Sequence, residues 1–162
     1  MNIRENLIDI NDRIKANAKG PVTLVAVSKT VTCDEVRAAM DAGQTVFGEN
    51  RVQELQNKYS VIGNKATWHL IGHLQTNKVK YVVDKVDLIH SVDSTRLADE
   101  ISRCCISKNI VMPCLLQVNV SKEDSKSGVY MEDVDRMVDY MLGLEGISLK
   151  GFMTMAPLDA SE

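Results

Sequence analysis

The chain has 162 residues, of which 44% are hydrophobic and 25% charged, and its formal net charge is -3. These values are typical of one soluble globular domain with a substantial core. The scattered basic residues give no indication of a nucleic-acid or anionic-membrane partner, so a small-molecule ligand is the favoured class of partner.

Strand-like and helix-like segments alternate along the whole chain. Six apolar runs have the length and composition of strands, at residues 22–29, 45–48, 67–74, 88–92, 111–120 and 148–155. Helical spacing of apolar residues predicts helices over 2–17, 33–42, 51–59, 77–85, 95–105 and 134–142. The run at 22–29 has no alternation, which predicts a strand buried on both faces. Thr32 and Glu35 form a capping box for the second helix.

Six strands separated by helix-sized segments predict a parallel sheet in one α/β domain that covers residues 1–162. Two architectures fit this pattern, an open doubly wound sheet and a TIM-type (β/α)8 barrel. The first strand ends in Ser28-Lys29-Thr30 without a G-x-G-x-x-G motif, which favours the barrel. A barrel typically needs about 200 residues or more. Periodicity alone therefore leaves the choice open.

Lys29 stands out among the residues at the carboxyl ends of the strands, where α/β proteins carry their functional groups. Burial at the mouth of a parallel sheet is expected to disfavour its ammonium form. Only a neutral amine attacks an aldehyde to form a Schiff base. A solvated lysine at a strand end is the plainer interpretation, and the residues alone favour it.

Other candidate residues have a structural explanation as well. His69 and His73 have the spacing of zinc ligands on a helix, but they fall on a strand that runs into a loop, so we predict no metal site. Asn50 fits a turn or a helix cap, and it could also hydrogen-bond a ring hydroxyl at a strand mouth. Met153 is most simply a strand residue, and Lys126 most simply belongs to a solvated loop.

The cysteines and the N-terminus predict a cytoplasmic protein. The four cysteines form no C-x-x-C pair, and Cys104, Cys105 and Cys114 fall on apolar faces that suit reduced, buried thiols. The N-terminus lacks the apolar segment of a signal peptide, and no apolar stretch approaches the length of a membrane span.

Several short motifs together resemble the pyridoxal phosphate homeostasis proteins (the YggS/PROSC family). In order, they are Val27-Ser-Lys-Thr30, Phe47-Gly-Glu-Asn-Arg-Val-Gln-Glu54, Trp68-His-Leu-Ile-Gly-His-Leu-Gln75, His90-Ser-Val-Asp93, Gln117-Val-Asn-Val120 with Lys126-Ser-Gly128, and Gly151-Phe-Met-Thr-Met155. Each motif is weak alone. Their order and their coverage of nearly the whole chain make the resemblance specific.

The resemblance implies a barrel similar to the alanine racemase N-terminal domain, of which this chain contains the first six β/α units. It further implies that Lys29 holds pyridoxal 5′-phosphate (PLP) as a Schiff base and that Asn50 and Met153 line the ring pocket. The expected function is that of a cofactor carrier without catalytic turnover, with apo PLP-dependent enzymes as recipients. A PLP-dependent racemase or lyase is the alternative, and a Schiff-base aldolase is a third possibility.

Family members continue for two more β/α units, which would carry the phosphate-binding segment, whereas this chain ends at Glu162. Loops at this place hold the phosphate in such barrels. We therefore expect these 162 residues to bind PLP weakly and to expose the edges of the first and sixth strands.

Overall fold

A computed structural model describes residues 2–121 and 127–155. In this part of the chain, six parallel strands form one sheet in the order β1-β2-β3-β4-β5-β6. The strands are β1 (Ala26–Val27), β2 (Val46–Glu49), β3 (Thr67–Leu70), β4 (Leu88–Val92), β5 (Met112–Gln117) and β6 (Ile147–Met153). The predicted parallel sheet is thus confirmed.

Helices follow most of the strands. The α-helices are α1 (Ile3–Asn17), α2 (Cys33–Asp41), α3 (Val52–Ile62), α4 (Thr95–Ser107) and α5 (Val134–Leu142). Three short 3₁₀ helices, η1 (Gly63–Lys65), η2 (Thr76–Tyr81) and η3 (Met131–Asp133), complete the connections. The capping box of α2 is present, because Thr32 Oγ1 accepts from the Glu35 N–H while the Glu35 carboxylate accepts from the Thr32 N–H.

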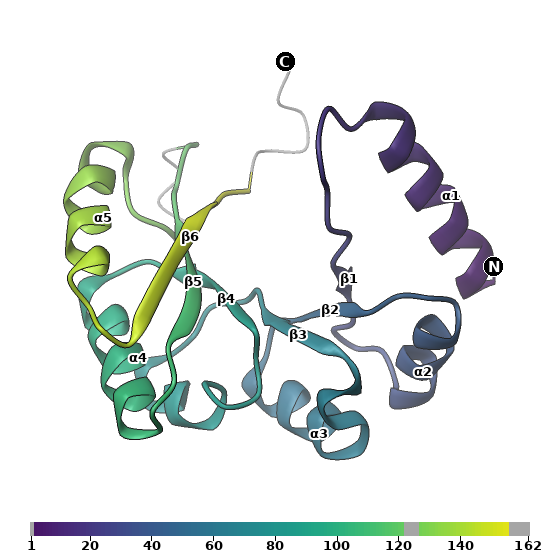
Figure 1. Ribbon diagram of the computed structural model, residues 1–162, viewed down its shortest axis with the longest axis horizontal. Helices are drawn as coiled ribbons and strands as arrows, with labels where there is room; N and C mark the ends of the chain where they lie inside the picture. Colours follow the sequence, from purple (N-terminus) through teal and green to yellow (C-terminus); the bar gives the residue numbers. More distant parts are fainter. Residues whose placement is uncertain (1, 122–126, 156–162) are drawn as a thin grey trace.

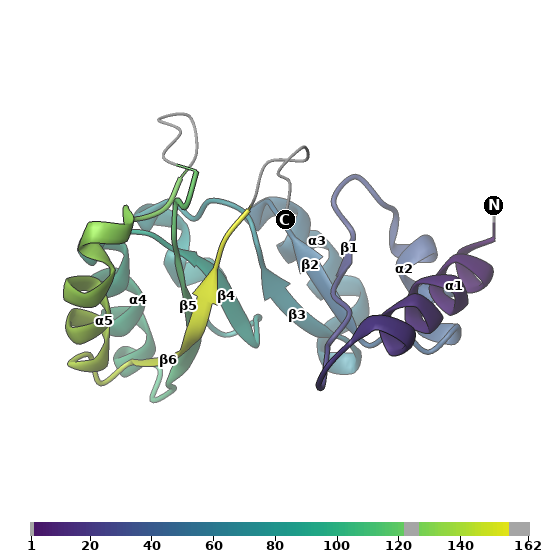
Figure 2. The same ribbon diagram turned by 90° about the horizontal axis from the view of Figure 1, so that it is seen from above.

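The strand order distinguishes between the two architectures that the sequence left open. A doubly wound sheet reverses its order near the middle, at its topological switch point. Here spatial order follows chain order throughout, so the doubly wound alternative is wrong. Figure 1 shows the sheet as an arc, with β1 and β6 at its two ends and the helices along its outer side. Figure 2 gives the same arrangement from above.

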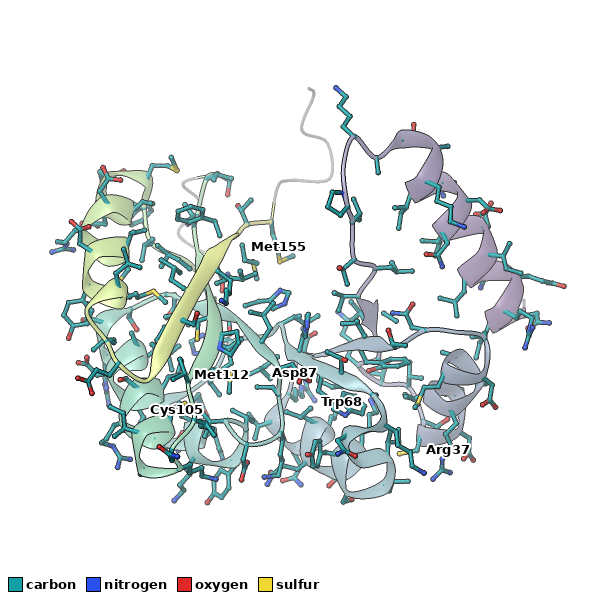
Figure 3. The ribbon with its side chains drawn as sticks, viewed as in Figure 1. Arg37, Trp68, Asp87, Cys105, Met112 and Met155 are labelled. Atoms are coloured by element: carbon teal, nitrogen blue, oxygen red, sulfur yellow. The ribbon has the colours of Figure 1, made fainter. Side chains whose placement is uncertain are left out.

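The main core lies between the sheet and the outer helices. Successive strand residues point to opposite faces, and on β3 Trp68 and Leu70 are fully buried while His69 is only partly buried. Figure 3 shows Trp68 on the helix side of the sheet and, farther along the arc, Cys105 of α4 near Met112 of β5. The inner face of the arc is correspondingly more exposed.

The first strand is much shorter than predicted. Its ladder contains only Ala26–Val27, and Val22 and Val27 are 58% and 51% exposed. The expectation of a strand buried on both faces is therefore wrong. The reason is position, because among the described strands β1 pairs only with β2 and has no neighbour on its other edge.

One helix prediction also needs correction. The segment after β3 forms the 3₁₀ helix η2 instead of an α-helix over 77–85, although the four valines of this segment, Val79, Val82, Val83 and Val86, are buried. β-branched side chains lose rotamer freedom in an α-helix, which weakens helix propensity in this segment. The predicted helix over 134–142 is confirmed as α5, in which Met137 and Met141 are buried and Leu142 is 67% exposed.

All four cysteines are free thiols, and Cys104, Cys105 and Cys114 are buried as predicted. Burial raises the pKa of Cys105 to about 11 and raises that of Cys114 further. These thiols are therefore poor nucleophiles and serve as core residues. Of the helices in the described ranges, none has the length and apolar character needed to cross a membrane.

Candidate functional site

A pocket of about 260 Å³ opens at the carboxyl ends of the strands, where an α/β protein is expected to carry its site. Its lining comes from the ends of β2, β3, β5 and β6 and comprises Asn50, Ile71, Gly72, His73, Gln117, Val118, Asn119, Ser127, Met153 and Met155. Asn50 and Met153, which are far apart in the sequence, thus meet in one pocket. Met155 lies just beyond β6 in Figure 3.

Asn50 contributes a buried polar atom that has no partner. Its Oδ1 is inaccessible to solvent and accepts no hydrogen bond within the described part of the chain. Buried polar atoms in folded proteins are nearly always paired, so an orphan in a pocket wall suits a hydrogen-bonding ligand. Gly72 allows this wall to form, because a Cβ at that position would lie 2.3 Å from the Asn50 carbonyl oxygen.

Lys29 lies next to this region but does not line the pocket. The β1–β2 pairing ends at Val27 with Gly48, and the Ser28 N–H donates to the Gly48 carbonyl oxygen. Lys29 follows in the loop beyond β1, at the carboxyl end of the sheet. The Lys29 side chain is exposed, and its amine makes no hydrogen bond or ion pair with the described residues. The expected burial of the Lys29 side chain is therefore wrong. Among the described strands β1 lies at the edge of the sheet, so no neighbouring strand covers this residue.

A buried ion pair beneath Lys29 was not foreseen from the sequence. Lys58 Nζ on α3 lies 2.5 Å from Glu49 Oε1 on β2, and both side chains are buried. Ser28 Oγ donates to the same carboxylate oxygen over 2.6 Å. The signal in the sequence was the buried stripe of α3, where Lys58 lies between Leu55 and Ile62 at helical spacing.

The inner face of the sheet carries a histidine pair. His90 Nε2 on β4 lies 3.0 Å from His69 Nδ1 on β3. Burial, with a smaller contribution from the neighbouring His69, lowers the pKa of His90 to about 4. Burial also lowers the pKa of His69. Both rings are therefore neutral at physiological pH, and one donates a hydrogen bond to the other.

This pair predicts a loss of stability in mild acid. An unfolded histidine has a pKa of about 6.5, so between that pH and about 4 the unfolded chain binds more protons at His90 than the folded chain does. The free energy of unfolding should therefore fall by about 1–2 kcal/mol between pH 7 and pH 5 through this group. Urea unfolding at both pH values measures the loss.

His73, the one histidine outside this pair, supplies the comparison. His90→Gln should remove most of that pH dependence, whereas the same change at the exposed His73 should keep it. Equal pH dependence in the His90 variant and the wild type would contradict a neutral, buried pair.

His69 and His73 do not share an ion, since His69 pairs with His90 and His73 Nδ1 lies 3.7 Å from Asp93 Oδ2. Over residues 2–121 and 127–155, no group of three or more His, Cys, Asp or Glu is placed to hold a metal ion. Lys126 lies outside the described residues.

Comparison with known proteins identifies the family to which this chain belongs. The family described as alanine racemase, N-terminal domain, matches residues 2–162. A pyridoxal phosphate homeostasis protein of Aquifex aeolicus is 40% identical over 164 residues, which cover 97% of this chain and 72% of the relative.

Solved structures agree with this result. PipY of Synechococcus elongatus, determined with PLP bound, superposes with a TM-score of 0.85 at 33% identity, covering 98% of this chain and 73% of PipY. Alanine racemase of Clostridium difficile has a TM-score of 0.75 at 16% identity, covering 98% and 41% of the two chains, and shares the fold. This chain therefore has an alanine racemase-like α/β fold and belongs to the pyridoxal phosphate homeostasis protein family.

Proposed function

We propose that this protein binds PLP as a Schiff base on Lys29 and acts as a carrier that takes part in PLP homeostasis. The observation that supports this most directly is the position of Lys29, an exposed amine without a partner among the described residues, in the turn that follows β1 at the carboxyl end of the sheet. PipY, a relative with 33% identity, has PLP bound in its solved structure.

Schiff-base formation requires few groups from the protein. The neutral Lys29 amine and the aldehyde carbon of PLP would form a C=N bond with release of one water molecule, and hydrolysis would reverse the step. The orphan Oδ1 of Asn50 would accept a hydrogen bond from the ring substituents, and Met153 would contact the apolar edge of the ring. None of the described residues that line the pocket is Lys or Arg, so the phosphate would need partners elsewhere.

Two further features belong to this proposal. The chain-order arrangement of the strands and the helices on one side support a single domain that forms six units of a (β/α)8 barrel. The relatives are named as pyridoxal phosphate homeostasis proteins, which supports a role in PLP homeostasis. The proposal extends this role to a carrier that acts in the cytoplasm and delivers PLP to apo enzymes without turnover of its own. A PLP-dependent racemase of the same fold remains the alternative, and conversion of L-alanine to D-alanine by the PLP-loaded chain would establish it.

The experiment that tests the proposal is an absorbance spectrum of the purified chain with PLP, followed by borohydride reduction and peptide mapping by mass spectrometry. We expect a band near the edge of the visible range and a reduced pyridoxyl adduct on Lys29. Lys29→Ala should abolish both, because none of the described residues that line the pocket carries an amine.

Lys65→Ala is the matched control, since Lys65 is also exposed but precedes β3 at the opposite end of the sheet. It should leave the band and the adduct unchanged. Adducts spread evenly over the exposed lysines would show that Lys29 is not selected and would overturn the proposal.

Asn50→Ala should weaken PLP binding without lowering stability. A hydrogen bond contributes about 0.5–1.5 kcal/mol, so the dissociation constant should rise about two- to tenfold. The free energy of unfolding should not decrease, because the variant loses a buried oxygen that has no partner in the described structure. Titration with PLP and urea unfolding measure the two effects.

Met153→Leu serves as the comparison in the same pocket, because it conserves volume and should change binding little. A stability loss in Asn50→Ala together with unchanged binding would assign Asn50 a purely structural role.

A further inference from the structure

Lys29 occupies a tight turn whose backbone is constrained. The Val31 N–H donates to the Ser28 carbonyl over 3.1 Å, which closes the turn around Lys29 and Thr30. Thr30 has a φ of 62°, in the left-handed region that a β-branched residue rarely adopts. Such a conformation persists only where the surrounding structure holds it. The contacts that hold this turn therefore determine the position of the Lys29 Cα, from which the side chain extends.

Two side chains of α3 supply those contacts. Glu54 Oε2 accepts from the Thr30 N–H over 3.0 Å, and Lys58 Nζ donates to the Ser28 carbonyl oxygen over 2.5 Å. Residues four apart lie on the same face of a helix, so both reach the turn from one side. Between them, they hold the peptide group before Lys29 and the peptide group after it.

The buried ion pair fixes one of these contacts. Glu49 is 0% exposed and Lys58 5% exposed, and Glu49 Oε1 accepts from both Lys58 and Ser28 Oγ. A buried charge needs its partner, so Lys58 cannot leave the Ser28 carbonyl without leaving Glu49 as well. The turn is thereby tied to β2 and α3 and does not depend on the two-residue strand β1 alone.

We infer that Glu54 and Lys58 are positioning residues that aim Lys29 at the site by holding the two peptide groups that flank it. The inference rests on the proposed role of Lys29 and adds how that lysine is selected from the other exposed amines. A functional side chain must be held by its supporting contacts to react selectively. If the turn relaxes, the Lys29 amine keeps its chemistry, but the backbone from which it extends loses its fixed place at the carboxyl end of the sheet.

The test is the selectivity of lysine modification within one folded protein. The chain is treated with limiting PLP and borohydride, and the ratio of pyridoxyl adduct on Lys29 to that on Lys65 is measured by peptide mapping. In Glu54→Ala this ratio should fall about tenfold, the effect of losing a hydrogen bond to a charged group. Asn57→Ala, an exposed change on the same helix, should leave it unchanged.

Glu54→Gln keeps an oxygen that can accept from Thr30 and should restore most of the ratio. The paired change Glu49→Gln with Lys58→Met removes the other contact without leaving a buried charge, and should lower the ratio by a similar factor. A folded Glu54→Ala protein, or a folded paired variant if the first does not fold, that retains the wild-type ratio would overturn the inference. Absence of Lys29 selectivity in the wild type would instead reject the proposed function itself.

Discussion

Lys58→Met should lower the free energy of unfolding by about 3–5 kcal/mol, the usual effect of removing one partner of a buried ion pair. Lys58 and Glu49 are both buried, and their charged atoms lie 2.5 Å apart. Methionine has a similar shape but cannot donate, so the Glu49 carboxylate would remain buried without its cation. The Ser28 carbonyl would also lose a donor. Urea unfolding followed by circular dichroism measures the change.

The paired variant separates charge from packing. When both charged partners become neutral and volume is kept, the stability of a protein often changes little. Glu49→Gln combined with Lys58→Met should therefore recover most of the loss. If the single and paired variants were equally unstable, packing of Lys58 would explain the effect and the ion pair would not.

Local signals in the sequence predicted much of the fold. β4 covers the predicted residues 88–92, and the capping box of α2 forms as expected. The capping box depends on residues close in the chain, because the Glu35 N–H donates to Thr32 Oγ1. The extent of β4 follows from its own apolar, β-branched composition. Alternation of strands and helices likewise predicts a parallel sheet, because each crossover needs a helix-sized connection.

Features that depend on distant neighbours were predicted less well. The apolar composition of 22–29 suggests a buried strand, but burial depends on a neighbour at the outer edge of β1, and the described strands supply none. The exposure of Lys29 follows from the same edge position. Choosing between a doubly wound sheet and a sequential one requires the strand order, which periodicity does not contain.

The candidate site was predictable in outline only. Asn50 and Met153 come from strand ends, and parallel strands bring their carboxyl ends to one edge, so their meeting in one pocket follows from the topology. The buried Glu49–Lys58 pair depends on how α3 packs against β2. An isolated charged residue on the apolar face of a helix indicates a buried ion pair, but it does not identify the partner residue.

Trp68→Ala should cost about 3–5 kcal/mol of unfolding free energy, the range for deleting a large aromatic residue from a core. Trp68 is 0% exposed and lies on the helix side of β3, where its ring centroid is 5.8 Å from that of Phe47. Its indole Nε1–H donates to the Gly63 carbonyl oxygen over 3.0 Å. The change would leave both a cavity and an unpaired carbonyl. Denaturant unfolding followed by far-ultraviolet circular dichroism measures the loss.

Two comparisons show which part of the loss comes from burial. Trp68→Phe keeps an aromatic ring in the core and should lose less stability than Trp68→Ala. Phe152→Ala removes an aromatic ring that is 58% exposed and should have a small effect. A loss in Trp68→Ala as small as that of Phe152→Ala would contradict a core role.

The same variant tests what the Trp68-His-Leu-Ile-Gly-His73 motif does. This motif carries part of the resemblance to PLP-binding relatives, yet Trp68 is buried on the helix side of the sheet and does not line the pocket. The folded fraction of Trp68→Ala should therefore keep the wild-type ratio of Lys29 to Lys65 modification. Ile71, Gly72 and His73, which do line the pocket, are the residues of the motif in contact with the site. One short motif thus combines a residue that stabilises the core with residues that shape the pocket.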